Sequence, residues 1–312
     1  MGYWEIARNR RVLTKLNVAR PARYRLAATD IDGTILPHGG TISARTRQAL
    51  AACADAGTHV VLATGRPPRW VTPILEATGH RGTVIAANGA VVIDSARGMH
   101  TRHRLTAATV HDVVHALRRR VKDVLFGVET PHEFRAEAGY RAARGGNVGH
   151  LTPRSAAATP EAPRIEQLLD DEPIIKVVAL SATLSPDELL AVGREAVGDL
   201  AVPTHSSTGL ALLELGPRDV SKASTLAAVA SSLGVHRTEV IAFGDMPNDV
   251  EMLAWSGAGY AMEGGHPEAI AAAPHLAPPA AEDGVAQVLE REVLASSGAP
   301  DEMRLPAVPS GR

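Results

Sequence analysis

The stretch Ala27–Leu36 reads AATDIDGTIL: a short apolar run ends at Asp30, and Asp32, Gly33 and Thr34 follow. In an extended segment, residues two apart share a face, so the two carboxylates point the same way. In open α/β sheets, ligands bind beyond the carboxyl ends of the strands, where this pair lies. Two like charges this close need a divalent cation, or one must hold a proton, as in an acid/base pair. The stretch therefore predicts a reactive site at a strand tip.

Two plainer interpretations of this stretch are a surface Asp-Gly turn and a calcium-binding loop. An Asp-Gly turn occurs in many proteins, and the stretch alone leaves it open. An EF-hand loop needs Glu at its twelfth position, which counted from Asp30 is Thr41. The calcium loop is therefore excluded.

Beyond this stretch, short apolar strands alternate with amphipathic helices. We expect strands at Arg25–Thr29, His59–Ala63, Thr83–Ala86 and Val240–Phe243, and helices at Ser43–Ala56, Pro68–Thr78 and Val220–Leu233. This alternation is typical of βα units on a parallel sheet. The fold class that we predict is α/β, with a Rossmann-like parallel-sheet core.

A segment with its own set of elements follows the predicted hairpin turn at Asn88-Gly89. We expect helices at 107–120 and from Ser185 onward, strands at 124–129, 133–137, 174–180 and 200–205, and a loose, Arg-rich region at 141–163. We then expect Leu210–Leu215 to return to the main sheet. This pattern predicts an inserted α/β cap domain at 96–208, between two parts of the core at 25–95 and 209–293.

The two ends of the chain differ in composition from the rest. Residues 1–24 carry several Arg and Lys residues against a single acid, Glu5, and we expect a disordered basic leader. A weak contact with an anionic surface is the alternative. Residues 294–312 are rich in Ser, Gly and Pro and predict a flexible tail.

Overall composition excludes several classes of protein. The 312 residues predict about two domains, and 32 Lys and Arg against 34 Asp and Glu argue against a generic nucleic-acid-binding protein. No apolar stretch approaches the roughly 20 residues of a membrane span. The single cysteine, Cys53, excludes an intramolecular disulfide and a Cys-rich zinc site. With no secretory signal visible, we expect a cytoplasmic protein; its oligomeric state stays open.

Thr64 and Gly65 lie where the apolar run VVLA ends and the next helix begins. A hydroxyl and backbone N–H groups at a helix N-terminus can bind a phosphate. Taken alone, the motif favours the alternative, an ordinary strand-to-helix cap by Thr64. Both interpretations stay open at this point.

Lys222 lies at the start of a predicted helix, where a cation is electrostatically disfavoured unless an anion compensates it. Only four of the 32 cationic residues are lysine, so this position departs from the arginine preference of the chain. A site that needs a compact ammonium explains the choice. A solvated surface lysine is the alternative.

Asp245 follows the strongly apolar run VIAFG, and Asn248 and Asp249 open the next helix. Carboxylates so placed are the oxygen ligands that magnesium prefers. Helix N-caps by Asn or Asp are the alternative. Four separate segments thus carry, in chain order, two aspartates, a threonine, a lysine and two further aspartates. This set of side chains suits metal-assisted phosphoryl transfer. Unrelated helix caps and turns would rarely supply all of it.

From about Leu26 to Leu289, the sequence resembles the haloacid dehalogenase superfamily, in particular its Cof-like branch with an inserted α/β cap. The signatures are DxDGT at Asp30–Thr34 and GDxxND at Gly244–Asp249. Asn88-Gly89-Ala90 and Asp283-Gly284-Val285 also match the family pattern.

The resemblance implies a role for each matching residue. Asp30 would be the nucleophile that forms an aspartyl-phosphate, and Asp32 the acid/base group. Thr64 would donate to the phosphoryl oxygens, and Lys222 would neutralise their charge. The implied substrate-binding residues are Thr64, Gly65, Asn88, Lys176, Lys222 and Asn248.

The resemblance also implies a Mg²⁺ cofactor. Its ligands would be the carboxylates of Asp30 and Asp245 and the backbone carbonyl of Asp32, with Asp249 orienting Lys222 or a water ligand beside Asn248. The metal residues are thus Asp30, Asp32, Asp245 and Asp249. One departure is Gly264-Gly265, where relatives often carry Asn-Ala; it puts a contact on the substrate side in doubt.

Specificity should reside in the cap, which closes over the cleft. The candidate polar groups are His132, Glu133, Arg135, Tyr140, Arg144, Asn147, His150 and Lys176. Lys176 either reaches the pocket or is a plain charge on the sheet surface. The histidines show no metal-ligand spacing, and we expect them at the surface.

The function that these residues favour is a Mg²⁺-dependent phosphatase acting on a small phosphorylated metabolite, a sugar phosphate or similar. Alternatives are a phosphomutase of the same superfamily and a catalytically idle protein that binds a phospho-ligand. The presence of Asp30, Asp32, Lys222, Asp245 and Asp249 together argues against the idle protein, because a protein that only binds a ligand has no need of a nucleophile.

Overall fold

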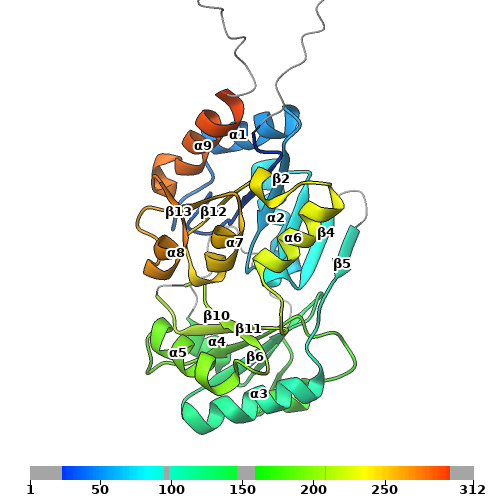
Figure 1. Ribbon diagram of the computed structural model, residues 1–312. Coiled ribbons are helices and arrows are strands. Elements are labelled where there is room, and N and C mark those ends of the chain that lie inside the picture. The colour runs from blue at the N-terminus through cyan, green and yellow to red at the C-terminus, as the bar shows by residue number, and fades with distance from the viewer. Residues whose placement is uncertain (1–22, 95–97, 146–158, 208, 296–312) are drawn as a thin grey trace, which may run out of the picture.

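The computed structural model describes residues 23–94, 98–145, 159–207 and 209–295. Figure 1 shows two lobes, each built around one β-sheet, with the residues nearest both chain ends in the upper lobe. Among the described residues, no helix combines the length and apolar character that crossing a bilayer requires. The basic leader, except its last two residues, and nearly all of the predicted tail lie outside the described residues.

The sheet of the upper lobe has eight strands in the order β14-β13-β12-β1-β2-β3-β4-β5. Their bounds are β1 (Leu26–Thr29), β2 (His59–Ala63), β3 (Thr83–Ala86), β4 (Val91–Asp94), β5 (Gly98–Thr101), β12 (Val240–Gly244), β13 (Ala258–Met262) and β14 (His275–Ala277). All neighbours from β14 to β3 pair in parallel, and β4 and β5 extend the sheet antiparallel. The parallel part has the Rossmann strand order, which confirms the predicted fold class.

Helices cover both faces of this sheet, which explains why its strands are continuously apolar. On one face lie α1 (Ala44–Asp55), α2 (Thr72–Thr78) and α9 (Gly284–Leu289); on the other lie α6 (Lys222–Ser232) and α7 (Val250–Trp255). Alternate residues of β1 serve the two layers: Ala27 packs with the first set, and Leu26 and Ala28 pack with the second. α8 (Pro267–Ala272) lies beside α7 (Figure 1).

The lower lobe has a six-stranded sheet in the order β10-β11-β9-β6-β7-β8. Its strands are β6 (Leu125–Glu129), β7 (Phe134–Glu137), β8 (Glu161–Ala162), β9 (Lys176–Leu180), β10 (Val202–Thr204) and β11 (Leu212–Gly216). Only β7 and β8 pair in parallel. Helices α3 (Ala107–Arg120) and α5 (Pro186–Val197) cover one face, and the short helix α4 (Tyr140–Arg144) follows β7. The other face is turned toward the upper lobe.

Local sequence signals account for several boundaries. The side chains of Ser43, Thr106 and Ser185 accept the first free backbone N–H groups of α1, α3 and α5. The predicted helix 68–78 is instead a 3₁₀ turn, η1 (Pro68–Trp70), followed by α2. Pro73 causes this break, because proline supplies no N–H and favours the first turn of a helix.

The return of Leu210–Leu215 to the main sheet was a wrong prediction. Strand β11 pairs with β9 and β10, in the lower sheet. An apolar run fits either sheet equally well, and only the tertiary pairing partners decide between them. The domain boundaries themselves stay a prediction.

Candidate active site

The two central strands of the upper sheet, β1 and β12, are parallel neighbours, with Thr29 opposite Phe243. Asp30 directly follows β1, and Asp245 directly follows β12. The strand order reverses between these two strands, so their carboxyl ends border the crevice where such sheets bind ligands. Two acidic motifs more than two hundred residues apart therefore meet at one point.

Lys222 lies between two carboxylates at this point. Its Nζ donates to Asp30 Oδ1 over 2.6 Å and to Asp249 Oδ1 over 2.8 Å, and its side chain is fully buried. The other oxygen of Asp249 accepts the backbone N–H groups of Asp245 and Met246, at 3.0 and 3.1 Å. Asp249 thus fixes both the lysine and the turn after β12. The predicted need of Lys222 for a compensating anion is confirmed.

Asp245 is held by the loop that follows β1. Thr34 Oγ1 donates to Asp245 Oδ1 over 3.0 Å. Gly33 has a φ of +86°, and a Cβ at this position would lie 2.1 Å from Asp245 Oδ2. Only glycine leaves room for that carboxylate, which explains the glycine of the DxDGT signature.

Burial and crowding raise the pKa values of two of these acids. Asp30 is buried, and desolvation together with the nearby Asp249 and Asp245 raises its pKa well above the usual value, although Lys222 opposes the shift. Burial and Asp249 raise the pKa of Asp245 to about 7. The pKa of Lys222 is also raised, because its two carboxylate partners outweigh the effect of its burial.

These acids form a donor set that suits a hard divalent cation. Carboxylate oxygens of Asp30, Asp245 and Asp249 all lie within 4.8 Å of one another, and all three residues are buried. Lys222 supplies one positive charge against three carboxylates, so the cluster retains an excess of negative charge. An all-oxygen set of this kind is what Mg²⁺ prefers over softer metals.

Arg66 holds both oxygens of Asp32. Its Nε donates to Asp32 Oδ2 over 2.7 Å, and one terminal nitrogen donates to Oδ1 over 2.6 Å. The backbone N–H of Arg66 donates to Thr64 Oγ1 over 3.0 Å. The strand tip after β2 therefore positions the second carboxylate of the DxDGT signature, and Thr64 shapes the turn that allows it.

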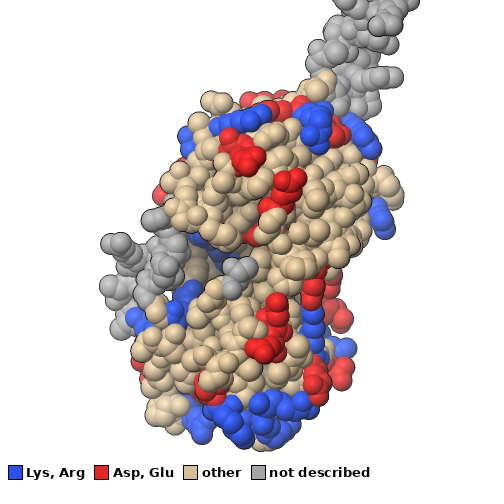
Figure 2. Space-filling view, turned by 90° about the vertical axis from the view of Figure 1, so that its left-hand side faces the viewer, with Lys and Arg blue, Asp and Glu red and all other residues tan. Residues whose placement is uncertain are grey.

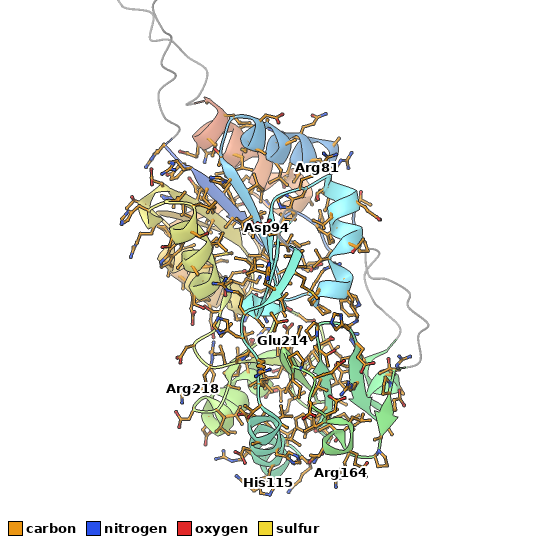
Figure 3. All side chains as sticks on the ribbon, turned by 90° about the vertical axis from the view of Figure 1, so that its right-hand side faces the viewer. Arg81, Asp94, His115, Arg164, Glu214 and Arg218 are labelled. Atoms are coloured by element: carbon orange, nitrogen blue, oxygen red, sulfur yellow. The ribbon has the colours of Figure 1, made fainter. Side chains whose placement is uncertain are left out.

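A buried polar network joins the lower sheet to the strand tips. Lys176 Nζ donates to the Gly65 carbonyl over 2.7 Å and to Glu214 Oε2 over 3.0 Å. Asn88 Nδ2 donates to the same Glu214 oxygen over 2.8 Å, and Asn248 Nδ2 donates to Asn88 Oδ1 over 3.1 Å. Figure 3 labels Glu214 at the junction of the two lobes. Lys176 is thus not a surface charge.

These groups border a pocket of about 500 Å³ between the lobes. Predicted residues that line it are Asp30, Asp32, Gly65, Lys176 and Asn248. Thr64, Asn88, Lys222, Asp245 and Asp249 are buried beside it. Figure 2 shows basic side chains in and beside the hollow that separates the two lobes.

The family model for haloacid dehalogenase-like hydrolases matches residues 27–289. The chain belongs to this family. As a haloacid dehalogenase-like hydrolase of the phosphatase type, it has the expected catalytic signatures in the expected order, and its parallel core with an inserted mixed sheet is the fold of subclass IIB.

Three relatives illustrate the likeness. A protein of Streptococcus pyogenes serotype M6, named provisionally as a phosphatase, is 29% identical over 282 residues, which is 86% of this chain and 98% of the relative. The HMP-PP phosphatase of Citrobacter koseri is 29% identical over 257 residues, or 81% and 89%. The structure of the subclass IIB sugar phosphatase BT4131 has a TM-score of 0.72 at 19% identity and covers 86% and 98%. Two of these relatives are named for different substrates. The likeness therefore establishes the hydrolase family and the fold but not the substrate of this chain.

Several residues of the site were missed by sequence reasoning. Arg66 follows Thr64-Gly65 directly, and its place beside a strand tip was a usable signal. The sequence held no signal for Glu214, because a single acid in an apolar strand does not show that it pairs with Lys176. Arg69 and Glu129 form an ion pair across the two lobes that spacing likewise could not show.

The cap candidates divide between the pocket and other places. Tyr140, Arg144 and Lys176 line the pocket. Arg135 instead pairs with Glu133 and Asp170. His132 is exposed, and Asn147 and His150 lie outside the described residues.

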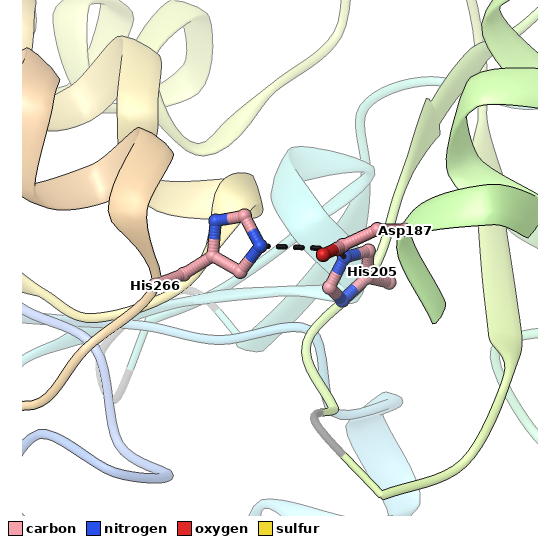
Figure 4. A group of neighbouring side chains, drawn as sticks. All are labelled: Asp187, His205 and His266. Carbon is pink, nitrogen blue, oxygen red and sulfur yellow. Dashed lines mark hydrogen bonds and ion pairs between the residues drawn. The ribbon is translucent and has the colours of Figure 1, made fainter. Parts of the chain in front are cut away.

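The expectation that the histidines lie at the surface is wrong for His205, which is 1% exposed. His205 Nε2 and His266 Nε2 each lie 3.0 Å from Asp187 Oδ1, in a group that joins the lobes (Figure 4). The backbone N–H of Glu268 donates to His266 Nδ1, which favours the tautomer with its proton on Nε2, pointing at Asp187. The arrangement is therefore a hydrogen-bonded contact between the lobes.

The Gly264-Gly265 departure has a steric reason in this hydrolase. Gly264 has a φ of +82°, and a Cβ at Gly265 would lie 2.8 Å from the Asp245 carbonyl oxygen. That oxygen accepts the backbone N–H of His266 over 2.7 Å. The two glycines allow this turn to approach the backbone of Asp245 closely.

Proposed function

We propose that the chain hydrolyses the phosphate monoester of a small metabolite through an aspartyl-phosphate on Asp30. The observation that carries this proposal is the position of Asp30: its carboxylate borders a pocket of about 500 Å³ and accepts from the buried ammonium of Lys222 over 2.6 Å. A carboxylate nucleophile divides the hydrolysis into two easier displacements.

In the first displacement, an Asp30 oxygen forms a bond to phosphorus as the ester P–O bond breaks. Asp32 gives its proton to the departing alkoxide, so that a neutral alcohol leaves. Lys222, held by Asp249, offsets the negative charge at the nucleophile and the phosphoryl oxygens. The Thr64 hydroxyl and the Gly65 N–H, which follow β2 beside the pocket, would donate to those oxygens, whereas the Arg66 N–H already donates to Thr64 Oγ1.

Arg66 must change partners for Asp32 to act as an acid. Its guanidinium donates to both Asp32 oxygens, so neither oxygen is available to a leaving group while this contact lasts. An incoming phosphate dianion competes for the guanidinium and leaves Asp32 free to carry a proton. Arg66 would thus bind the phosphate group and, by the same movement, release Asp32 to act as the general acid.

In the second displacement, water attacks the phosphorus of the aspartyl-phosphate. Asp32, now a carboxylate, takes the proton from that water, and the bond between Asp30 and phosphorus breaks. Inorganic phosphate leaves, and both carboxylates return to their starting states. The lower lobe limits other water at the site, which protects the acyl phosphate from uncontrolled hydrolysis.

Mg²⁺ suits the acidic cluster, and the residues that would hold it are the carboxylates of Asp30 and Asp245 and the backbone carbonyl of Asp32. When bound, the ion reduces the repulsion between an anionic nucleophile and a dianionic substrate. Asp249 contributes less directly, because its oxygens already accept from Lys222 and two backbone N–H groups.

Replacing the nucleophile tests the proposal. Asp30→Asn keeps the size of the side chain and the hydrogen bond to Lys222 but removes the attacking charge, so hydrolysis of an aryl phosphate with Mg²⁺ should fall by about 10³-fold or more. Turnover that survives intact would refute the nucleophile. Quantitative release of inorganic phosphate distinguishes hydrolysis from a phosphomutase, which returns the phosphoryl group to a bound product.

A further inference from the structure

Part of the lower-lobe side of the pocket is an apolar patch. Val178 of β9, Leu212 of β11 and Phe134 of β7 line it, together with Tyr140 of α4. Alternate residues of a strand face opposite sides of a sheet, so Val178 and Leu212 share the face turned toward the upper lobe. The side chains of Val178, Leu212 and Phe134 give no hydrogen-bond partners to a ligand. The charged lower-lobe groups beside them, Lys176, Glu214 and Glu129, already form ion pairs within the protein.

Phe134 covers part of this patch because the neighbouring strand carries a glycine. A Cβ at Gly127 would lie 2.3 Å from Phe134 Cζ, so the ring lies flat over a position without a side chain. Phe134 also contacts Tyr140, with ring centroids 5.4 Å apart and a tilt of 56°. The two rings form an aromatic surface on the lower-lobe side of the pocket, whereas Asp30 lies on the upper-lobe side.

Each acid that lines the pocket already has a cation of its own. The pairs are Asp30 with Lys222, Asp32 with Arg66, Glu129 with Arg69, and Glu214 with Lys176. Of the Arg and Lys residues that line the pocket, all but one thus pair with an acid of the protein.

The exception is Arg144, at the end of α4. It lines the pocket, is half-buried, and stacks on Trp70, with its Cζ 5.4 Å from the ring centroid. Among the residues that the structure describes, no carboxylate forms an ion pair with Arg144. Glu129 is near enough to influence it, but both Glu129 oxygens accept from Arg69. Arg144 therefore offers a guanidinium to a ligand.

We propose that the substrate alcohol has an apolar, ring-containing body and carries a carboxylate at the end away from the phosphate, and that Arg144 binds this carboxylate. The proposal rests on the proposed phosphatase function. A ring gains free energy when it is buried against Phe134 and Val178, whereas sugar hydroxyls there would lose their hydrogen bonds to water. A guanidinium and a carboxylate form a strong, paired hydrogen bond.

Three phosphate esters test the two parts of the proposal: 4-carboxybenzyl phosphate, benzyl phosphate and a hexose 6-phosphate. The kcat/KM value should be highest for the first and lowest for the hexose ester, with steps of about tenfold each. If the hexose ester reacts faster than benzyl phosphate, the proposal that the pocket selects an apolar, ring-containing substrate is wrong. If the kcat/KM values of the two benzyl esters are equal, the proposed contact between Arg144 and the substrate carboxylate is wrong.

An arginine on the same helix provides a matched control. Arg144→Gln should lower kcat/KM for 4-carboxybenzyl phosphate by about tenfold or more and change that for benzyl phosphate less than about threefold. Arg141→Gln, at an exposed position outside the pocket, should change neither. An equal loss for both esters in Arg144→Gln would show a merely structural role and contradict the proposal.

Binding measurements separate this inference from the proposed function. Calorimetry with benzylphosphonate and 4-carboxybenzylphosphonate, on the chain and on Arg144→Gln, requires no turnover. If no ester is hydrolysed, including a simple aryl phosphate, the phosphatase mechanism fails. If hydrolysis occurs but the carboxylate does not strengthen binding at least about tenfold through Arg144, the substrate class fails alone.

Discussion

The two sides of the pocket are built differently. On the upper side, Asp30, Lys222 and Asp249 are buried and bound to one another, and each follows or opens an element of the parallel sheet. On the lower side, Phe134 lies on a strand of the mixed sheet and Arg144 at the end of its short helix. Arg69 stacks on the ring of Phe134, and Arg144 stacks on the ring of Trp70.

Under the proposed function, this difference would separate the residues that carry out the reaction from those that select the substrate. On the upper side, removal of one buried charge would leave its partner buried and unpaired, which strongly destabilises the folded state. The residue types on this side are therefore strongly constrained. The lower side holds an apolar patch and Arg144, with which none of the described acids pairs, and other side chains could replace these residues without unfolding the protein. Changes on the upper side should therefore affect both folding and reaction, and changes on the lower side mainly choose the substrate.

The largest effect is expected for Lys222→Met. Removal of the buried ammonium leaves Asp30 and Asp249 as unpaired buried carboxylates, which should lower the free energy of unfolding by about 3–5 kcal/mol and abolish hydrolysis. Denaturant unfolding measures the first effect. Lys122→Met, at an exposed lysine, is the matched control and should change neither quantity. Equal stability of the two variants would contradict the central ion network.

An intermediate effect is expected for Glu214→Gln, at the junction between the two sides. Burial raises the pKa of Glu214, but Lys176 and the hydrogen bonds from Ser206 and Asn88 outweigh it, so the pKa is lowered. The folded chain then binds fewer protons than the unfolded chain, where the glutamate pKa is about 4.3. The stability that this carboxylate contributes is present at neutral pH and is lost as the pH falls below about 5.

Unfolding curves from pH 7 to pH 3 check this linkage. Glu214→Gln should be less stable than the parent chain at pH 7, and the difference should shrink on acidification. Glu251→Gln, an exposed acid on α7, should follow the parent chain at every pH. A difference for Glu214→Gln that does not depend on pH would show that the charge of this residue contributes nothing.

The smallest effect is expected for Asp187→Ala, at the contact between the lobes outside the pocket. The variant loses the acceptor of His205 and His266, which should cost about 1 kcal/mol of unfolding free energy. Asp187→Asn keeps an acceptor oxygen and should lose less. A drop in kcat/KM without a loss of stability in Asp187→Ala would instead show that this contact controls the position of the lower lobe.

Sequence patterns located the upper side far better than the lower side. Strands β2 and β3 and helix α3 have the predicted bounds, because each has a strong apolar pattern between clear turn or cap signals. The pairing of β11 was predicted wrongly, since an apolar run does not name its neighbour. For the same reason, the partner of Lys176 could not be predicted: Glu214 lies 38 residues further along the chain.

The sequence by itself determined the α/β class, the catalytic signatures and the unusual lysine at position 222. These follow from short-range rules: strand tips carry polar residues, and a cation at a helix start needs an anion. Only the tertiary structure decided that Arg66 holds Asp32, that Glu214 joins Lys176 to Asn88, and that none of the described acids pairs with Arg144. Such pairings depend on which strand tips and sheet faces meet in space, and that depends on long-range packing which no local spacing records.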